Sequence, residues 1–283
     1  MSKAIVLGGG GIVGMAWHTG VVAGLAEAGF DVSAADRLIG TSAGAVVGVR
    51  LGLGLDMARE LERFERVPEA SEDKVQCRDD GRHAEELTRR FLTIVAEVSA
   101  REDADQRRAQ IGRRAMEAQT PSEEVYFARF APLSDVAWPR AFSCTAVDVV
   151  SGAFVVWDAA SGVNLAAAVA ASCAIPLRSP PVLVQNRRYM DGSLRTFTNA
   201  DLAKGHDRVL VLAPLGHLEA PGQAVGREVA ALTESGAEVT LVTPDAGAAS
   251  IIGMDLMNPA LQYAAAQAGL RQARDEVDGL RGW

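Results

Sequence analysis

The segment Gly-Thr-Ser-Ala-Gly at residues 40–44 has the pattern G-x-S-x-G, in which one serine stands between two glycines. In a sharp turn from a strand into a helix, this pattern exposes the serine hydroxyl as a nucleophile, and Gly40 and Gly44 occupy the positions where a side chain would crowd the turn. Attack on an ester carbonyl also needs a base and donors for the oxyanion. In the alternative interpretation, Ser42 is only a small residue that lets a strand and a helix pack closely.

A second glycine-rich segment, Leu-Gly-Gly-Gly-Gly-Ile-Val-Gly at residues 7–14, provides candidate donors for an oxyanion. Consecutive glycines allow backbone N–H groups to point at a developing negative charge without obstruction by side chains. The same glycines satisfy G-x-G-x-x-G, the fingerprint of dinucleotide-binding loops, which requires an acidic residue at the end of the second strand. Here the strand predicted at 37–40 continues instead into a threonine and Ser42, so the two turns together favour acyl chemistry.

The base has two kinds of candidate. A Ser-Asp-His order would use a late histidine, His206 or His217, but residue 42 leaves room for only one strand before the strand that carries the serine. The other candidate is Asp191 in Tyr-Met-Asp-Gly-Ser, although an aspartate before a glycine is also typical of a simple turn. We expect His18 to be a surface or core residue of the first helix.

Short apolar segments alternate with helical segments along most of the chain, which predicts an α/β fold. Residues 3–8 and 37–40 predict buried strands, each followed by a glycine turn and a helix. Both turns then end neighbouring strands at one edge of the sheet, where open α/β sheets bind ligands. Strand patterns return after residue 140, with a hairpin around Ser151 and Gly152. We expect one domain over residues 1–283, with a helical insertion at about 56–130 that forms a side layer or a lid.

Composition excludes several classes of protein. The 283 residues are 48% hydrophobic and 23% charged, as in an ordinary globular protein. The net charge of −8 argues against a nucleic-acid partner, because phosphate binding needs a basic face. Three scattered cysteines, Cys77, Cys144 and Cys173, predict reduced thiols rather than disulfides. No segment resembles a signal peptide or a membrane span, so we expect a cytoplasmic protein, and no residue cluster implies a metal or a cofactor.

Four segments resemble, in their order and spacing, those of patatin-like phospholipases. They are IVLGGGGIVGMAWHTGVVAGLAEAG, GTSAGAVVG, ASCAIPLRSPPV and YMDGS, and they cover residues 4–54 and about 141–215. The resemblance implies a patatin-like three-layer α/β/α sandwich with a mainly parallel central sheet. It also implies a serine–aspartate dyad without a histidine, in which Ser42 is the nucleophile and Asp191 accepts its proton. The oxyanion-hole glycines of the family correspond to Gly9, Gly10 and Gly11.

The chain departs from the family pattern at three places. Val13 stands where a basic residue is usual, Ser193 follows the Asp-Gly pair in place of glycine or alanine, and Asp201 replaces a proline two residues after Asn199. None of these changes removes the dyad, but the loss of a basic residue at position 13 favours a less charged ester.

The resemblance implies a serine acyl hydrolase that cleaves lipid or other carboxylic acyl esters and contacts membranes only transiently. The alternatives are a catalytically silent binding or interaction module and a nucleotide-binding α/β protein. Access to lipid would need an apolar mouth. An apolar cluster near the end of the helical insertion would either line such a mouth or pack in the core; it contains Phe127, Phe130, Leu133 and Trp138.

Overall fold

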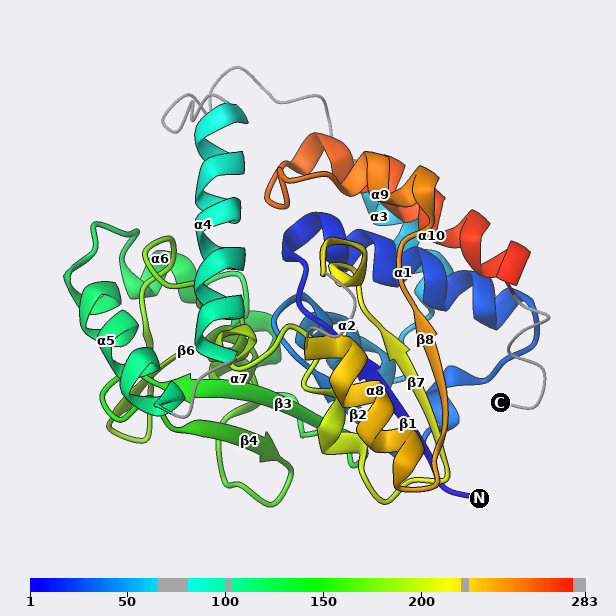
Figure 1. Cartoon of the computed structure of the whole chain (residues 1–283), viewed down its shortest axis with the longest axis horizontal. Coiled ribbons are helices and arrows are strands. Elements are labelled where there is room, and N and C mark those ends of the chain that lie inside the picture. The colour runs from blue at the N-terminus through cyan, green and yellow to red at the C-terminus, as the bar shows by residue number, and fades with distance from the viewer. Residues whose placement is uncertain (66–80, 100–102, 220–223, 277–283) are drawn as a thin grey trace.

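A computed structural model of the chain describes residues 1–65, 81–99, 103–219 and 224–276 (Figure 1). The described strands are β1 (Lys3–Leu7), β2 (Arg37–Gly40), β3 (Phe142–Asp148), β4 (Phe154–Asp158), β5 (Val182–Val184), β6 (Arg187–Asp191), β7 (Arg208–Leu212) and β8 (Glu238–Val242). The described helices are α1 (Gly11–Glu27), α2 (Ala43–Gly52), α3 (Met57–Glu65), α4 (Gly81–Ser99), α5 (Ala104–Glu117), α6 (Glu123–Phe127), α7 (Leu165–Ser172), α8 (Ala224–Glu234), α9 (Ala246–Ile252) and α10 (Gln262–Glu276).

The strands of the described residues form one eight-stranded sheet in the order β5-β6-β3-β2-β1-β7-β8, with β4 paired to β3. The five strands β3, β2, β1, β7 and β8 are parallel to one another. In contrast, β4 and β6 run antiparallel to β3, and β5 runs antiparallel to β6. The prediction of a mainly parallel central sheet is therefore confirmed. The predicted hairpin around Ser151 and Gly152 is the connection between β3 and β4.

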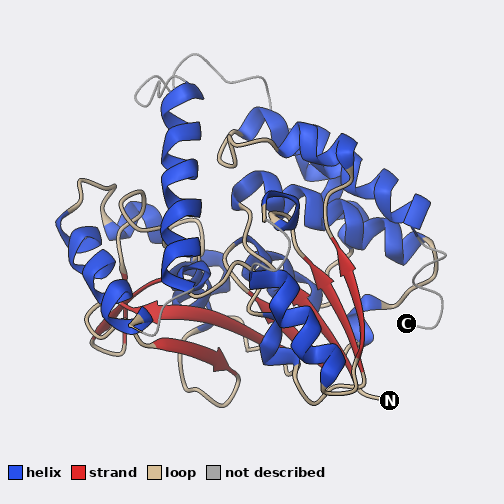
Figure 2. Ribbon diagram, viewed as in Figure 1, coloured by secondary structure: helices blue, strands red, loops and turns tan. Residues whose placement is uncertain are grey.

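Helices cover both faces of this sheet (Figure 2). Alternate residues of β1 belong to two separate cores: Ile5 and Leu7 pack with α1, α2 and α10, while Ala4 and Val6 pack on the other face with Val225 of α8. Because both faces of a central parallel strand are buried, its sequence is a continuous apolar run, which is why 3–8 predicts a strand so clearly. The three-layer α/β/α prediction is confirmed.

Several segments differ in detail from the predictions. The first helix begins at Gly11, inside the glycine run that was predicted to be a turn. Within the predicted insertion, α3 packs on α1, whereas α4 contacts the turn that follows Asp191. Cys77 lies outside the described residues.

Candidate active site

The strands that lead to the predicted serine and aspartate pair with the same edge of β3. β4 pairs with residues 143–147 of β3, a range that overlaps both the β3 residues paired with β2 and those paired with β6. β4 therefore lies along the opposite edge of β3. β2 is parallel to β3 and β6 is antiparallel, so these two strands run toward each other. Gly40 lies opposite Cys144 and Asp191 lies opposite Ala146, two residues further along β3. This register brings Asp191 against the turn that follows β2.

That turn is a strained elbow between β2 and α2. Ser42 has φ 54° and ψ −118°, in the region that non-glycine residues rarely adopt. A methyl group added to Gly44 would lie 1.9 Å from the carbonyl oxygen of Leu7, and one added to Gly40 would lie 2.5 Å from Cα of Ala45. Both positions therefore require glycine, as the G-x-S-x-G pattern predicts, and the close packing is itself what forces the serine outward from the sheet.

The side chains of Ser42 and Asp191 form a buried hydrogen bond. Ser42 Oγ donates to Asp191 Oδ2 at 2.7 Å, and the N–H of Ser193 donates to the other carboxylate oxygen at 2.8 Å. Asp191 is fully buried, while Ser42 is 5% exposed. Burial raises the pKa of the Asp191 carboxyl group from its ordinary 3.8 to about 6, although hydrogen bonds from Ser193 and Ser42 oppose the shift. At neutral pH the group is a carboxylate of increased basicity.

The end of α7 holds the backbone of the nucleophile candidate. The N–H of Ser42 donates to Ser172 Oγ at 3.0 Å, and Cys173 Sγ donates to the Ser42 carbonyl oxygen at 3.2 Å. These contacts secure the strained backbone on both sides of its Cα. They also occupy the Ser42 N–H, which is therefore not available as an oxyanion donor.

The glycine loop lies beside the elbow, but its N–H groups are not equivalent. The Gly9 N–H donates to the carbonyl oxygen of Phe197 at 2.7 Å. In the described part of the chain, the N–H groups of Gly10 and Gly11 have no hydrogen-bond partner. A methyl group on Gly9 would lie 3.5 Å from Cβ of Ser42, so the loop and the serine are in contact. Of the three glycines predicted as donors, Gly10 and Gly11 are thus the two whose N–H groups have no acceptor among the described residues.

Val13 lies one turn into α1 and is fully buried in the main core. Its N–H donates to the carbonyl oxygen of Leu256 at 3.1 Å. The position that is usually basic in the family therefore supplies an apolar core contact in this chain, and the glycine loop presents backbone dipoles without a charged side chain from position 13.

None of the described histidine rings contacts the two candidate catalytic residues. His18 is fully buried with Nε2 2.9 Å from the carbonyl oxygen of Gly8, and burial lowers its pKa to about 4. His206 contacts a carbonyl oxygen of its own loop, and His217 lies in a half-buried turn after β7. The side chain of His83, in α4, lies outside the described residues. Of the two positions expected for His18, surface or core of the first helix, the structure shows the core. The Ser-Asp-His alternative finds no support in these contacts.

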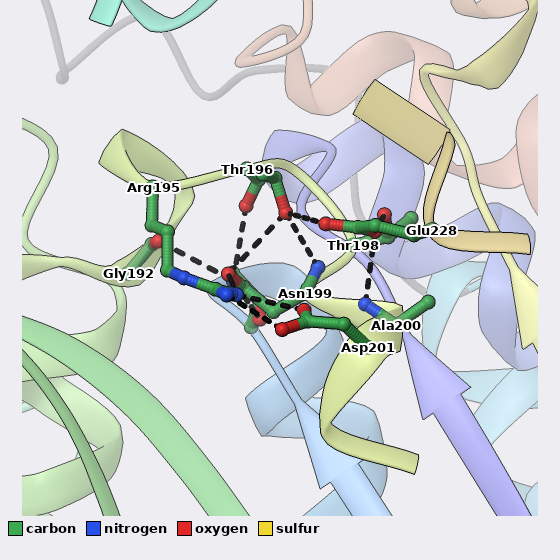
Figure 3. A network of polar contacts seen from close by, with 9 residues as sticks. Gly192, Arg195, Thr196, Thr198, Asn199, Ala200, Asp201 and Glu228 are labelled. Atoms are coloured by element: carbon green, nitrogen blue, oxygen red, sulfur yellow. Dashed lines mark hydrogen bonds and ion pairs between the residues drawn. The ribbon is translucent and has the colours of Figure 1, made fainter. Parts of the chain in front are cut away.

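Sequence reasoning missed the polar network around the loop that follows Asp191 (Figure 3). Glu228 of α8 is buried and accepts hydrogen bonds from the hydroxyl groups of Thr196 and Thr198. Asn199, in the same loop, reaches Thr41, the residue before the nucleophile candidate. Thr41 lies inside the G-x-S-x-G motif, and Asn199 belongs to the family pattern from which Asp201 departs. No spacing rule links these two residues to a glutamate on a helix that follows another strand.

Among the described residues, no group of three His, Cys, Asp or Glu side chains could hold a metal ion. No described helix has the length and apolar character needed to cross a membrane. The predicted apolar cluster is half-buried and packs against the main core, which favours its interpretation as core; it consists of Phe127, Phe130, Leu133 and Trp138.

Comparison with known proteins places this geometry in a family context. A family model described as patatin-like phospholipase matches residues 5–204. No curated protein matches the chain. Among solved structures, VipD from Legionella pneumophila is similar with a TM-score of 0.46 and 12% identity, over 98% of this chain and 67% of that one. The type III effector protein ExoU is similar with a TM-score of 0.45 and 15% identity, over 98% of this chain and 53% of that one, so this chain spans about half of its length.

Proposed function

The chain belongs to the patatin-like phospholipase family, which supports a lipid acyl hydrolase, and from this premise we propose that it cleaves carboxylic acyl esters through Ser42 and Asp191. One observation carries the proposal. It is the 2.7 Å hydrogen bond from the Ser42 hydroxyl to a fully buried carboxylate. The bond is made at a strained elbow in contact with a glycine loop in which two backbone N–H groups have no partner among the described residues. Such an arrangement combines a nucleophile, a base and oxyanion donors in one place.

In the proposed reaction, Ser42 Oγ attacks the ester carbonyl carbon while its proton passes to Asp191 Oδ2, the atom that already accepts it. The carbonyl oxygen becomes an oxyanion and accepts hydrogen bonds from the N–H groups of Gly10 and Gly11. Collapse of the tetrahedral intermediate breaks the C–O bond to the alcohol, which leaves with the proton from Asp191. Water then attacks the acyl-serine, Asp191 accepts a proton from it, and the carboxylic acid product is released with Ser42 restored.

Burial explains how a carboxylate serves as the base without a histidine. Removal of water raises the pKa of Asp191 to about 6, so the group remains ionised at pH 7 and binds a proton more readily than an exposed aspartate. The N–H of Ser193 holds one oxygen of the carboxylate, so the other oxygen stays directed at Ser42. The dyad therefore needs no histidine to orient the base.

The substrate class follows from the family and from the charges around the site. Lipid esters are the substrates that the family supports, and we propose transient contact with a lipid surface during substrate entry. The fully buried Val13 leaves stabilisation of the oxyanion to backbone dipoles, which favours esters without a strongly anionic group next to the scissile bond. Residues 1–283 as one domain, and residues 56–130 as a lid, stay predictions.

A fluorophosphonate probe tests the proposed nucleophile directly. We expect the probe to modify Ser42, identified by mass spectrometry of the labelled peptide, and we expect Ser42→Ala and Asp191→Asn to abolish labelling and to lower ester hydrolysis by about 10⁴-fold. Ser250→Ala and Asp275→Asn are matched controls, because both residues are exposed and contribute nothing to the site.

Two outcomes would contradict the proposal. A folded protein that neither labels nor hydrolyses esters, with lipid or detergent present, would favour the silent binding module. Labelling that survives Asp191→Asn but is lost when His206 or His217 is replaced would assign the base to a histidine. Circular dichroism of each variant establishes that it is folded before its rate is interpreted.

A further inference from the structure

One side chain contacts the chain neighbours of both candidate catalytic residues. Asn199 Nδ2 donates to Thr41 Oγ1 at 3.1 Å and to the carbonyl oxygen of Gly192 at 3.4 Å. Thr41 directly precedes Ser42, and Gly192 directly follows Asp191. The nucleophile and the base come from strands that are far apart in sequence, so this amide bridges the two halves of the dyad.

The orientation of the Asn199 amide is determined by its surroundings (Figure 3). Its Oδ1 accepts a hydrogen bond from Arg195 Nη1 at 3.0 Å, and a guanidinium group can only donate, so the NH₂ group must face Thr41. Arg195 is itself held by two hydrogen bonds to Asp201, of 2.8 and 2.6 Å. Asp201 is the departure from the family proline, and in this chain it orients the arginine that orients Asn199.

The backbone of Asn199 is held as firmly as its side chain. Asn199 is fully buried and has φ 53°, a left-handed conformation that asparagine tolerates better than most residues. The Glu228 carboxylate on α8 accepts hydrogen bonds on both sides of it, from the Thr198 hydroxyl at 2.5 Å and from the N–H of Ala200 at 2.9 Å. Thr196 Oγ1 donates to the same carboxylate at 2.6 Å.

Thr41 links this hydrogen-bond network to the central sheet. Its Oγ1 lies 2.9 Å from Oγ1 of Thr145, which occupies the single position on β3 between the residues that face Gly40 and Asp191. A methyl group on Gly192 would lie 2.1 Å from the same Thr145 oxygen, so the backbone after the base is also pressed against it. Asn199, Thr41 and Thr145 thus form a buried chain of polar groups behind the Ser42–Asp191 hydrogen bond.

We propose that Asn199 is a positioning residue, which sets the distance and direction of Ser42 relative to Asp191 through its hydrogen bonds to Thr41 and Gly192. The proposal rests on the proposed function of the dyad. Proton transfer depends on near-attack geometry, and a displacement of about 1 Å can cost about 100-fold in rate. Because neither the amide nor the threonine touches the substrate in this proposal, their loss should affect kcat rather than KM.

Thr41→Val and Thr41→Ser form the sharpest pair of variants. Valine keeps the shape of threonine but removes the hydroxyl that accepts from Asn199, whereas serine keeps the hydroxyl and removes only a methyl group. With a soluble ester, we expect Thr41→Val and Asn199→Ala each to lower kcat by about tenfold to 100-fold with KM changed less than twofold. Thr41→Ser should retain most of the activity, and the exposed Lys204→Ala, at the end of the same loop, should retain all of it.

The double variant Thr41→Val/Asn199→Ala distinguishes a shared interaction from two separate effects. If both residues act through one hydrogen bond, the double variant will be no slower than the slower single variant. Multiplied losses, or a Thr41→Val protein with wild-type kcat and wild-type labelling by a fluorophosphonate, would overturn the proposal while leaving the dyad intact. A wild-type protein without labelling or hydrolysis would overturn both. If Asn199→Ala fails to fold, the Thr41 pair alone decides the question.

Discussion

The serine elbow and the glycine loop are two turns built from similar residues, but their backbone N–H groups differ in how they are paired. Each follows a parallel strand, β2 or β1, and each leads into a helix. In the elbow, the N–H groups of Thr41, Ser42 and Gly44 all have acceptors. In the glycine loop, those of Gly10 and Gly11 have none in the described part of the chain.

The difference corresponds to what each turn has to present. The elbow presents a side chain, and the hydrogen bonds of the Thr41, Ser42 and Gly44 N–H groups hold its strained conformation. The loop presents its backbone, so two N–H groups at the start of a helix stay unpaired, where the helix dipole also favours negative charge. In the elbow, glycine is needed because a neighbouring strand is too close. In the loop, a methyl group on Gly10 would lie 2.8 Å from Cβ of Pro214, and one on Gly11 would lie 2.5 Å from the carbonyl oxygen of Leu256.

The largest expected effect comes from breaking the elbow by Gly44→Ala. The added methyl group would overlap the carbonyl oxygen of Leu7, so β1 and α2 must separate. We expect the variant to lose about 4 kcal/mol or more of unfolding free energy, measured by urea denaturation. Gly226→Ala in α8 is the matched control, because nothing lies within 4 Å of its added methyl group, and it should stabilise the helix by about 0.5 to 1 kcal/mol. Equal stability of the two variants would show that the elbow is not closely packed.

The next effect, measured through activity, should follow from Gly11→Ala in the loop. Gly11 has φ +64°, and its added methyl group would lie 2.5 Å from the carbonyl oxygen of Leu256, so the loop must shift. Displaced oxyanion donors should lower kcat by about 10²-fold to 10³-fold. Affinity for a trifluoromethyl ketone, which forms an oxyanion on the serine, should fall in parallel.

Gly54→Ala controls for backbone strain in this experiment. Gly54 has φ +70°, but its added methyl group meets nothing within 4 Å. If Gly54→Ala lowers kcat as much as Gly11→Ala does, the loss reflects a general effect of strain, and the assignment of oxyanion donors to the loop is wrong.

Much of this architecture can be predicted from the sequence because local patterns report it. The apolar runs at 3–8 and 37–40 mark strands buried on both faces, and the glycines at 40 and 44 report a close approach that only one residue type permits. The meeting of Ser42 with Asp191 follows from the family resemblance, not from a local pattern. It depends on the register of β2 and β6 on β3, which pairs Gly40 with Cys144 and Asp191 with Ala146, residues 104 and 45 apart in sequence.

Other features could not be predicted, because they depend on single long-range contacts. Gly9 looks like its neighbours in sequence, but its N–H is taken by Phe197. Glu228 reads as an ordinary polar residue of an amphipathic helix, yet it is buried against the loop that carries Asn199. Such partners are decided by how the elements pack, and no periodicity of the sequence records them.

The smallest expected effect is a dependence of kcat/KM on pH, which reports on the base and not on the rest of the elbow. Asp191 must be ionised to accept the serine proton, so kcat/KM should fall below an apparent pKa near 6 and be about tenfold lower at pH 5 than at pH 8. The titratable groups that face it, Tyr126 of α6 and Cys173 at the end of α7, stay neutral over this range because burial raises the pKa of both. The measurement is a pH–rate profile with a soluble ester whose leaving group does not titrate.

Stability should change with pH in the opposite direction to activity. The folded-state pKa of Asp191, about 6, lies above its ordinary 3.8, so folding favours the protonated carboxyl group. The stability that this protonated group contributes is fully present below pH 4 and is lost as the pH rises through 6. The difference of about two pKa units corresponds to about 3 kcal/mol at neutral pH. Asp191→Asn, which removes the charge and keeps the shape, should therefore be more stable than the wild type at pH 7.5 but not at pH 4. If kcat/KM falls at acid pH but the difference in stability between Asp191→Asn and the wild type does not change with pH, the fall in activity belongs to another group. The charged Asp191 would then not destabilise the fold.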